Sequence, residues 1–119
     1  MATDDFLGPT STAGFLEEIH MSQADLLVKL CEWYREQCNG DWEHGSGVLI
    51  DTLDNPGWMV KIDLRETALE NENFEAVKID DGKGGWLSCF KKGQEFTGSG
   101  DPSKLPVILE HFLKYAGKL

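Results

Sequence analysis

The chain has 119 residues, 40% of them apolar and 10% aromatic, which suits one hydrophobic core and excludes a disordered chain. Its 21 Asp and Glu against 11 Lys and Arg give a formal net charge of -10. This charge disfavours binding to nucleic acid or to an anionic membrane, and it favours steered association with a basic protein. We therefore expect a soluble, acidic domain, because no apolar run approaches the ~20 residues of a membrane span.

Residues 1–21 are predicted to form an N-terminal arm or leader, and residues 22–119 a single domain. The arm opens with Asp4 and Asp5 and has no basic region followed by an apolar run, so we do not expect a signal peptide. Three cysteines, an odd number, favour free thiols in a reducing compartment. These features together predict a cytoplasmic protein.

A first helix is predicted to begin after Ser22, a good N-cap residue, and to stop at Asn39 and Gly40. Asp25 follows Ser22 at the spacing of a capping box. Apolar residues recur at helical spacing and predict one buried face, made of Leu26, Leu27, Leu30, Cys31, Trp33 and Tyr34.

A β-hairpin is predicted from residues 48–53 and 58–64 around the turn D-N-P-G, where Gly57 is expected to take a positive φ. If Asp54 lies opposite Trp58, Asp51 faces Lys61 in a cross-strand ion pair. The alternation then places six residues on one face of the hairpin: Val48, Ile50, Thr52, Val60, Ile62 and Leu64.

Three further strands are predicted at residues 74–79, 86–90 and 94–97, and Gly98-Ser99-Gly100 is expected to end the sheet. Asp101 or Ser103 is expected to cap a second helix, whose inner face is Leu105, Ile108, Leu109, Phe112, Leu113 and Ala116. Short connections favour a meander. The predicted class is α+β, with an antiparallel sheet of about five strands and both helices on one face.

The connection between the first helix and the first strand carries Asp41, Trp42, Glu43 and His44 in succession. One hypothesis is a small metal-dependent or thiol enzyme centred on Asp41, Glu43 and His44. Zinc sites, however, show paired ligands such as C-x-x-C, which the chain lacks. Cys38 ends a helix, where the dipole disfavours a thiolate. We therefore predict no catalytic residue, no cofactor and no metal ligand.

Tryptophans ringed by charge are typical of protein interfaces, and three of the four tryptophans lie between Trp33 and Trp58. Trp33 is expected to be a core residue. For Trp42 both roles stay open, since its ring would serve equally as core or as interface.

The motifs W-Y-R-E-Q-C-N-G-D-W-E-H at residues 33–44, L-D-N-P-G-W at 53–58 and K-I-D-L at 61–64 resemble the immunity protein 53 family of bacterial polymorphic toxin systems. The later motifs W-L-S-C at 86–89 and F-T-G-S-G-D-P at 96–102, with the terminal helix, are similar to that family as well. The likeness covers roughly residues 26–113.

This resemblance implies a cytoplasmic antidote that binds and blocks a cognate protein toxin. The acidic surface suits a basic toxin domain of the nuclease or deaminase type. The residues expected to contact the toxin are Asp41, Trp42, Glu43 and His44, with Asp54, Asn55, Trp58 and Glu66 as a second ring. The protein itself is expected to be a monomer or a homodimer.

Overall fold

The computed structural model describes residues 22–45 and 47–119, so the expected N-terminal arm, residues 1–21, lies outside the described residues. The helices are α2 (Gln23–Gln37), the short 3-10 helix η1 (Trp42–His44) and α3 (Leu105–Tyr115). The strands are β1 (Val48–Leu53), β2 (Gly57–Asp63), β3 (Val77–Asp80), β4 (Trp86–Lys92) and β5 (Glu95–Gly100).

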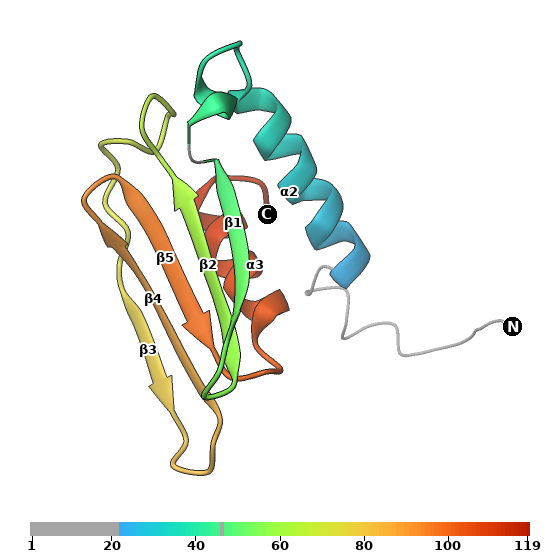
Figure 1. Ribbon diagram of the computed structural model, residues 1–119, viewed down its shortest axis with the longest axis vertical. Coiled ribbons are helices and arrows are strands. Elements are labelled where there is room, and N and C mark those ends of the chain that lie inside the picture. The colour runs from blue at the N-terminus through green and yellow to red at the C-terminus, as the bar shows by residue number, and fades with distance from the viewer. Residues whose placement is uncertain (1–21, 46) are drawn as a thin grey trace, which may run out of the picture.

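The five strands form one antiparallel sheet, and both helices lie on the same side of it (Figure 1). This confirms the predicted α+β class, but the strand order is β1-β2-β5-β4-β3 rather than that of a simple meander. The chain leaves β2, crosses to β3 at the far edge, and returns through β4 to β5. The last strand is therefore inserted beside β2, at the centre of the sheet.

The segment that crosses from β2 to β3 is held in place by two side chains from other elements. The Lys91 ammonium donates to the carbonyl oxygens of Leu69, Glu70 and Glu72 at 3.1, 2.8 and 2.7 Å. The Tyr115 hydroxyl donates to Leu69 O and Glu72 O at 3.2 and 2.6 Å. These bonds satisfy carbonyl groups of a segment that lies outside the strands, and they tie it to β4 and to α3.

The β1–β2 register differs from the predicted one by two residues. Asp51 lies opposite Met59 and Leu49 opposite Lys61, so the expected pairing of Asp51 with Lys61 is wrong. Because side chains alternate with a period of two, the faces were nevertheless assigned correctly. Val48 and Ile50 share a face with the fully buried Val60 and Ile62.

Glycines in the sheet serve close packing rather than unusual backbone angles. Gly57 is a β2 residue and is not among the glycines with positive φ, which corrects the prediction. A Cβ on it would lie 2.4 Å from the Gly100 carbonyl oxygen. A Cβ on Gly98 would lie 2.4 Å from the Ile108 side chain, so glycine at this position lets α3 approach the sheet. β5 runs through Gly100, and the prediction that residues 98–100 end the sheet is therefore wrong.

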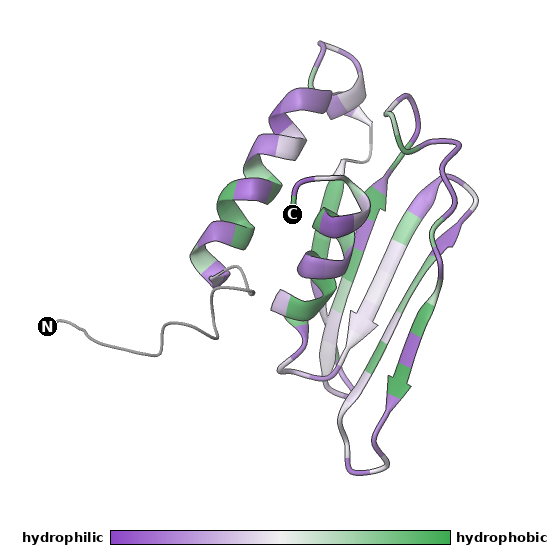
Figure 2. Cartoon of the chain, turned by 180° about the vertical axis from the view of Figure 1, so that it is seen from behind, coloured by the Kyte–Doolittle hydropathy of each residue, from purple (hydrophilic) through white to green (hydrophobic). Residues whose placement is uncertain are grey.

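The core lies between the sheet and α3, and α2 closes it from the side through an edge-to-face contact of Trp33 with Phe112 at 4.9 Å. The inner face of α3 agrees with the prediction. The buried face of α2 is narrower than predicted, since it contains only Leu26, Leu30 and Trp33. The remaining predicted face residues of α2 are exposed, among them Leu27 at 54% and Tyr34 at 40%, and Figure 2 shows apolar residues continuing along this helix.

Candidate partner-binding site

The loop after α2 is fixed by hydrogen bonds between its own residues. The Glu43 carboxylate accepts from the backbone N–H groups of Asn39 at 2.9 Å and Gly40 at 2.7 Å. The Asn39 side chain in turn accepts from the N–H groups of Asp41 at 2.9 Å and Trp42 at 3.0 Å. Backbone N–H donors, including its own, hold the pKa of Glu43 below its ordinary value. The spacing of Asn39 and Glu43 thus folds the loop around η1.

Trp42 anchors this loop in the core, which resolves the alternative left open for it. Its side chain is only 5% exposed, and it packs edge-on against Trp33 with ring centroids 5.8 Å apart. Tyr34 covers it at the same centroid distance. The indole Nε1 is buried and donates to no acceptor among the described residues. Trp42 therefore supports the surface from beneath and offers almost no area to a partner.

Asp41, Glu43, His44 and Glu66 form what we call the acidic corner, at the end of the sheet where β1 begins. Asp41 and Glu66 line a hollow of about 200 Å³ together with Asp63 and Arg65. Asp41, His44 and Glu66 are exposed, and Glu43 is half-buried. Glu66 has a φ of 63°, a left-handed conformation that is unusual for a residue with a Cβ.

The charge at the acidic corner is partly offset by an ion pair at its base. The Arg65 guanidinium donates to both oxygens of the buried Asp63, with Nη2 to Oδ2 at 2.9 Å. This bond lowers the pKa of Asp63, so the carboxylate stays ionised. Arg65 is itself mostly exposed, and the corner therefore presents one guanidinium among several carboxylates.

The remaining predicted contacts lie at the other end of β1. Asp54 and Asn55 are exposed at the hairpin turn, where the Asn55–Pro56 peptide bond is cis. Trp58 is half-buried, and its Nε1 donates to the Pro102 carbonyl oxygen at 3.0 Å. The eight predicted contact residues thus form two groups separated by the length of a strand, roughly 20 Å for six residues. Of the predicted second ring, only Glu66 lies near Asp41 in the structure.

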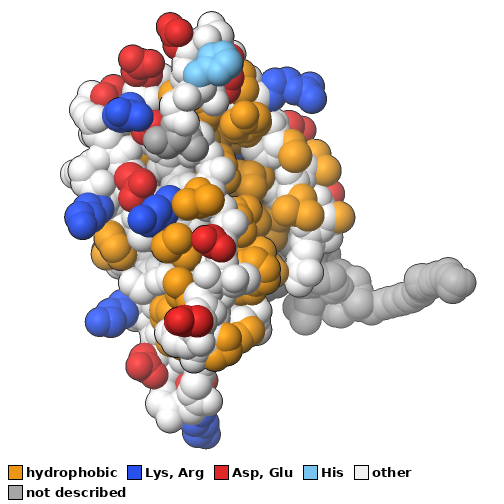
Figure 3. Space-filling model, in the orientation of Figure 1, with side chains coloured by type: hydrophobic (Ala, Val, Ile, Leu, Met, Phe, Trp, Pro, Cys, Tyr) orange, Lys and Arg blue, Asp and Glu red, His pale blue; other side chains and the backbone are white. Residues whose placement is uncertain are grey.

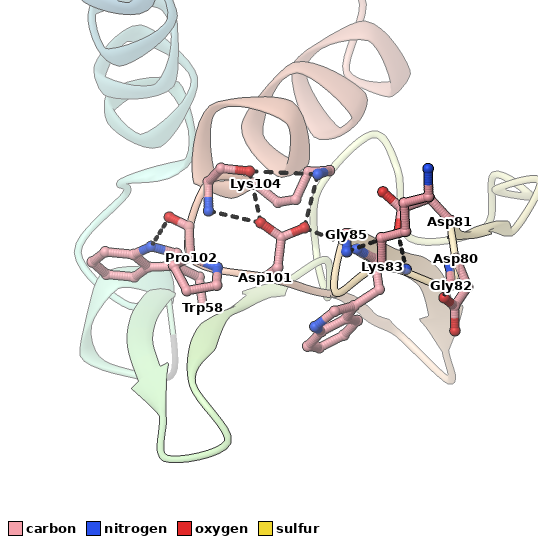
Figure 4. A network of polar contacts seen from close by, with 11 residues as sticks. Trp58, Asp80, Asp81, Gly82, Lys83, Gly85, Asp101, Pro102 and Lys104 are labelled. Carbon is pink, nitrogen blue, oxygen red and sulfur yellow. Dashed lines mark hydrogen bonds and ion pairs between the residues drawn. The ribbon is translucent and has the colours of Figure 1, made fainter.

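Asp101 accepts hydrogen bonds from Ser103, Lys104 and the Trp86 N–H in a polar network that we call the Asp101 clasp. Figure 4 shows Asp101 and Lys104 of this network beside Trp58. Asp101 is 6% exposed, and its carboxylate accepts from Trp86 N and Lys104 Nζ, both at 2.8 Å. Its other oxygen accepts from the Ser103 N–H and hydroxyl. These donors, Lys104 first, hold the pKa of Asp101 well below its ordinary value. The prediction that Asp101 or Ser103 caps the second helix is wrong, because the N-cap residue of α3 is Lys104.

A feature that sequence reasoning did not predict is a groove between α2 and the start of β1. It has a volume of about 320 Å³ and is lined by Leu30, Cys31, Tyr34, Glu43, Gly47 and Val48. We call it the β1 groove. Figure 3 shows apolar side chains gathered along the junction of the sheet with α2, with acidic side chains among them. The unexpected exposure of one flank of α2 creates this groove.

The chemistry of the thiols and acids bears on the enzyme hypothesis. Within residues 22–45 and 47–119, no three His, Cys, Asp or Glu side chains are grouped so that they could hold a metal ion. Cys89 is fully buried, and burial raises the pKa of its thiol to about 11, which makes it a poor nucleophile at neutral pH. Cys31 and Cys38 are exposed on α2 and at its end.

No helix in the described part of the chain is long and apolar enough to cross a membrane.

In the described part of the chain, fold and surface together define an acidic α+β domain that has one antiparallel sheet, the helices α2 and α3 on one side of it, and a charged corner fixed by its own loop. A family model described as immunity protein 53 matches residues 27–117, which include all the described helices and strands except the start of α2. The chain belongs to the immunity protein 53 family. No curated protein and no solved structure gave a significant match.

Proposed function

We propose that the protein acts in the cytoplasm as an antidote, and that it binds and neutralises a cognate toxin through its acidic surface. The observation that carries this proposal is membership of the immunity protein family over residues 27–117, because an immunity protein implies a toxin as partner. The net charge of -10 supports a basic toxin domain, of the kind that acts on nucleic acid as a nuclease or deaminase.

The acidic corner is our proposed region of electrostatic attraction. Its loop is held by Asn39 and Glu43, so Asp41 and His44 are presented without a large loss of conformational entropy on binding. Glu66 enters the same surface from the end of β2. Exposed carboxylates on a preorganised loop favour a fast encounter with a basic surface, and they do so more strongly at low salt.

The first experiment is co-expression with the toxin encoded beside this chain, with survival of the cells and isolation of the complex as readouts. We expect the chain to rescue growth and to bind the purified toxin domain. Failure of both rescue and binding at micromolar concentration would reject the proposal.

A second experiment tests the acidic corner by measuring association rates at several salt concentrations. Reversal of Asp41 and Glu66 to lysine is expected to slow association by about tenfold or more. Reversal of Glu72 and Glu75, which are exposed near the opposite edge, changes the net charge equally and is the matched control. Equal rates for the two double variants would locate the steering charge elsewhere.

A further inference from the structure

The two edges of the sheet differ in how well they are protected against pairing with another strand. β3 is a short edge of four residues, and it carries Lys78 and Asp80. β1 has six residues, V-L-I-D-T-L, with a single charge, no lysine and no proline. Leu49 and Ile50 on β1 are 48% and 38% exposed. Natural proteins shorten or charge the edges that must stay unpaired, and β1 lacks these features.

The backbone groups of β1 that point outward follow from its pairing with β2. The Asp63 N–H donates to Gly47 O at 2.9 Å, so the antiparallel alternation directs the backbone of Leu49 and Asp51 toward β2. The N–H and C=O groups of Val48 and Ile50 then point away from the sheet. The outward N–H of Thr52 is already taken by the Asp51 carboxylate at 2.8 Å. Val48 and Ile50 therefore offer two donors and two acceptors to an additional strand.

The β1 groove lies at the start of this edge and supplies apolar contacts for such a strand. Val48 and Ile50 are on the side of the sheet that faces the helices, because they lie opposite Ile62 and Val60 of the core. Leu27, Cys31 and Tyr34 follow each other at helical spacing along one exposed flank of α2. Cys31 and Tyr34 of this flank and Val48 of β1 line the β1 groove from its two sides, and we call this space between α2 and β1 the slot. Every second side chain of an added strand would enter the slot.

We propose that β1 is the docking edge for an extended segment of the toxin, which adds a sixth strand to the sheet and inserts apolar side chains between β1 and α2. This inference rests on the proposed function. Acidic groups at both ends of β1, with Asp41 and Glu43 at one end and Asp54 at the other, define the segment further. It carries a basic residue at each end, roughly 20 Å apart, and apolar residues at alternate positions between them.

Charge repulsion disfavours a second copy of this chain as the partner that pairs with the β1 edge. Two copies that paired β1 with β1 would bring together two bodies with a net charge of -10 each. A basic toxin segment gains from the same charges.

The binding test removes one outward N–H without changing the β1–β2 pairing. Ile50→Pro takes away an edge donor, and proline is tolerated where the N–H of an edge strand faces solvent. Lys78→Pro is the matched control, since the Asp81 N–H bond to Gly85 O places the Lys78 N–H outward on β3. With the purified toxin domain encoded beside this chain, we expect the dissociation constant to rise at least tenfold for Ile50→Pro and less than about twofold for Lys78→Pro.

A second pair of variants tests the slot. Leu27 and Val28 are each 54% exposed on α2, but only Leu27 continues the flank of Cys31 and Tyr34. Leu27→Lys is expected to weaken binding of the same toxin domain at least tenfold, whereas Val28→Lys changes it less than about twofold. If the wild-type chain binds and all four variants bind equally well, the docking edge is wrong while the proposed function stands. If the wild-type chain does not bind, the proposed function fails first.

Residue-resolved hydrogen exchange identifies the occupant of the β1 edge directly and needs no substitution in the folded domain. On addition of the toxin domain, the Val48 and Ile50 amides are expected to become protected, while Leu49 and Asp51 are already protected in the free protein. Protection of Val48 and Ile50 in the free protein that rises with concentration would assign the edge to a second copy. Protection in the free protein that disappears when residues 2–21 are deleted would assign it to that segment. Either result would overturn the proposal.

Discussion

The acidic corner and the Asp101 clasp lie at opposite ends of the sheet, and Asp41 of the corner and Asp101 of the clasp belong to motifs that carry the family resemblance. In the clasp, every oxygen of Asp101 has a protein donor, and the carboxylate is buried. In the corner, Asp41 and Glu66 are exposed beside an open hollow. The two motifs therefore serve different physical purposes. One motif secures the helix α3 to the sheet, and the other holds charge at the surface.

The largest effect on stability is expected from Trp42→Ala, which removes the anchor of the acidic corner. The ring is 5% exposed and contacts Trp33 and Tyr34, so its loss should lower the free energy of unfolding by about 3–5 kcal/mol. Trp42→Phe keeps an aromatic ring and removes the buried Nε1 donor, which has no acceptor among the residues that the structure describes, so it should cost much less. Urea denaturation measures both variants. Equal losses would contradict the packing argument.

A smaller effect with a distinctive pH dependence is expected from Asp101→Asn in the clasp. The folded state lowers the pKa of Asp101, so its contribution to stability is complete above the ordinary carboxyl pKa and is lost as the pH falls below it. The difference in unfolding free energy between wild type and variant should stay constant from pH 7 to about 5 and shrink below about pH 4. A difference that grows on acidification would contradict this sign.

Trp58→Phe tests the second contact at the clasp end. It removes the hydrogen bond from Trp58 Nε1 to the Pro102 carbonyl oxygen, and we expect a loss of about 1 kcal/mol in unfolding free energy. Trp58 was also predicted to touch the toxin. Thermal melting together with toxin binding separates the two roles, because a purely structural residue would change the melting temperature and leave the affinity of the folded protein unchanged.

The smallest effect is expected from Glu66→Gly at the acidic corner. Glycine relieves the backbone strain of the left-handed φ of 63°, but it also raises the conformational entropy of the unfolded chain. The net gain in unfolding free energy should therefore be roughly 0.5 kcal/mol. Glu66→Ala removes the same carboxylate and keeps the Cβ, so it should bring no gain. Denaturation curves of the two variants provide the comparison, and a stabilised alanine variant would indicate that charge repulsion, rather than backbone strain, is what glycine relieves.

Local signals in the sequence predicted the elements well, because each depends on neighbouring residues. The Ser22 cap is confirmed by its bond to the Asp25 N–H at 3.1 Å, and the inner face of α3 is confirmed by the burial of Ile108 and Phe112. The strand order was not predictable in the same way. It is a matter of contacts between residues far apart in the chain, such as those of Lys91 and Tyr115 with the Leu69 carbonyl oxygen, and no periodicity encodes such contacts.

The candidate site was predicted only in part, for a similar reason. Charge and tryptophan content indicated an interface, but they could not show that Trp42 would be covered by Tyr34 or that Asp54 would lie a strand length away from Asp41. The predicted toxin contacts and the toxin itself stay predictions. The exposed flank of α2 looked like core in the sequence, because an apolar face predicts burial without naming what covers it.

The position of β5 has a consequence for how the protein is made. β5 joins the β1–β2 hairpin to the β3–β4 pair, yet it is the last strand to leave the ribosome, and α3 follows it. The two halves of the sheet must therefore wait for the C-terminal part of the chain before a common core can form. Nascent chains that stop before Gly100 lack part of β5 and all of α3, so we expect them not to form this core.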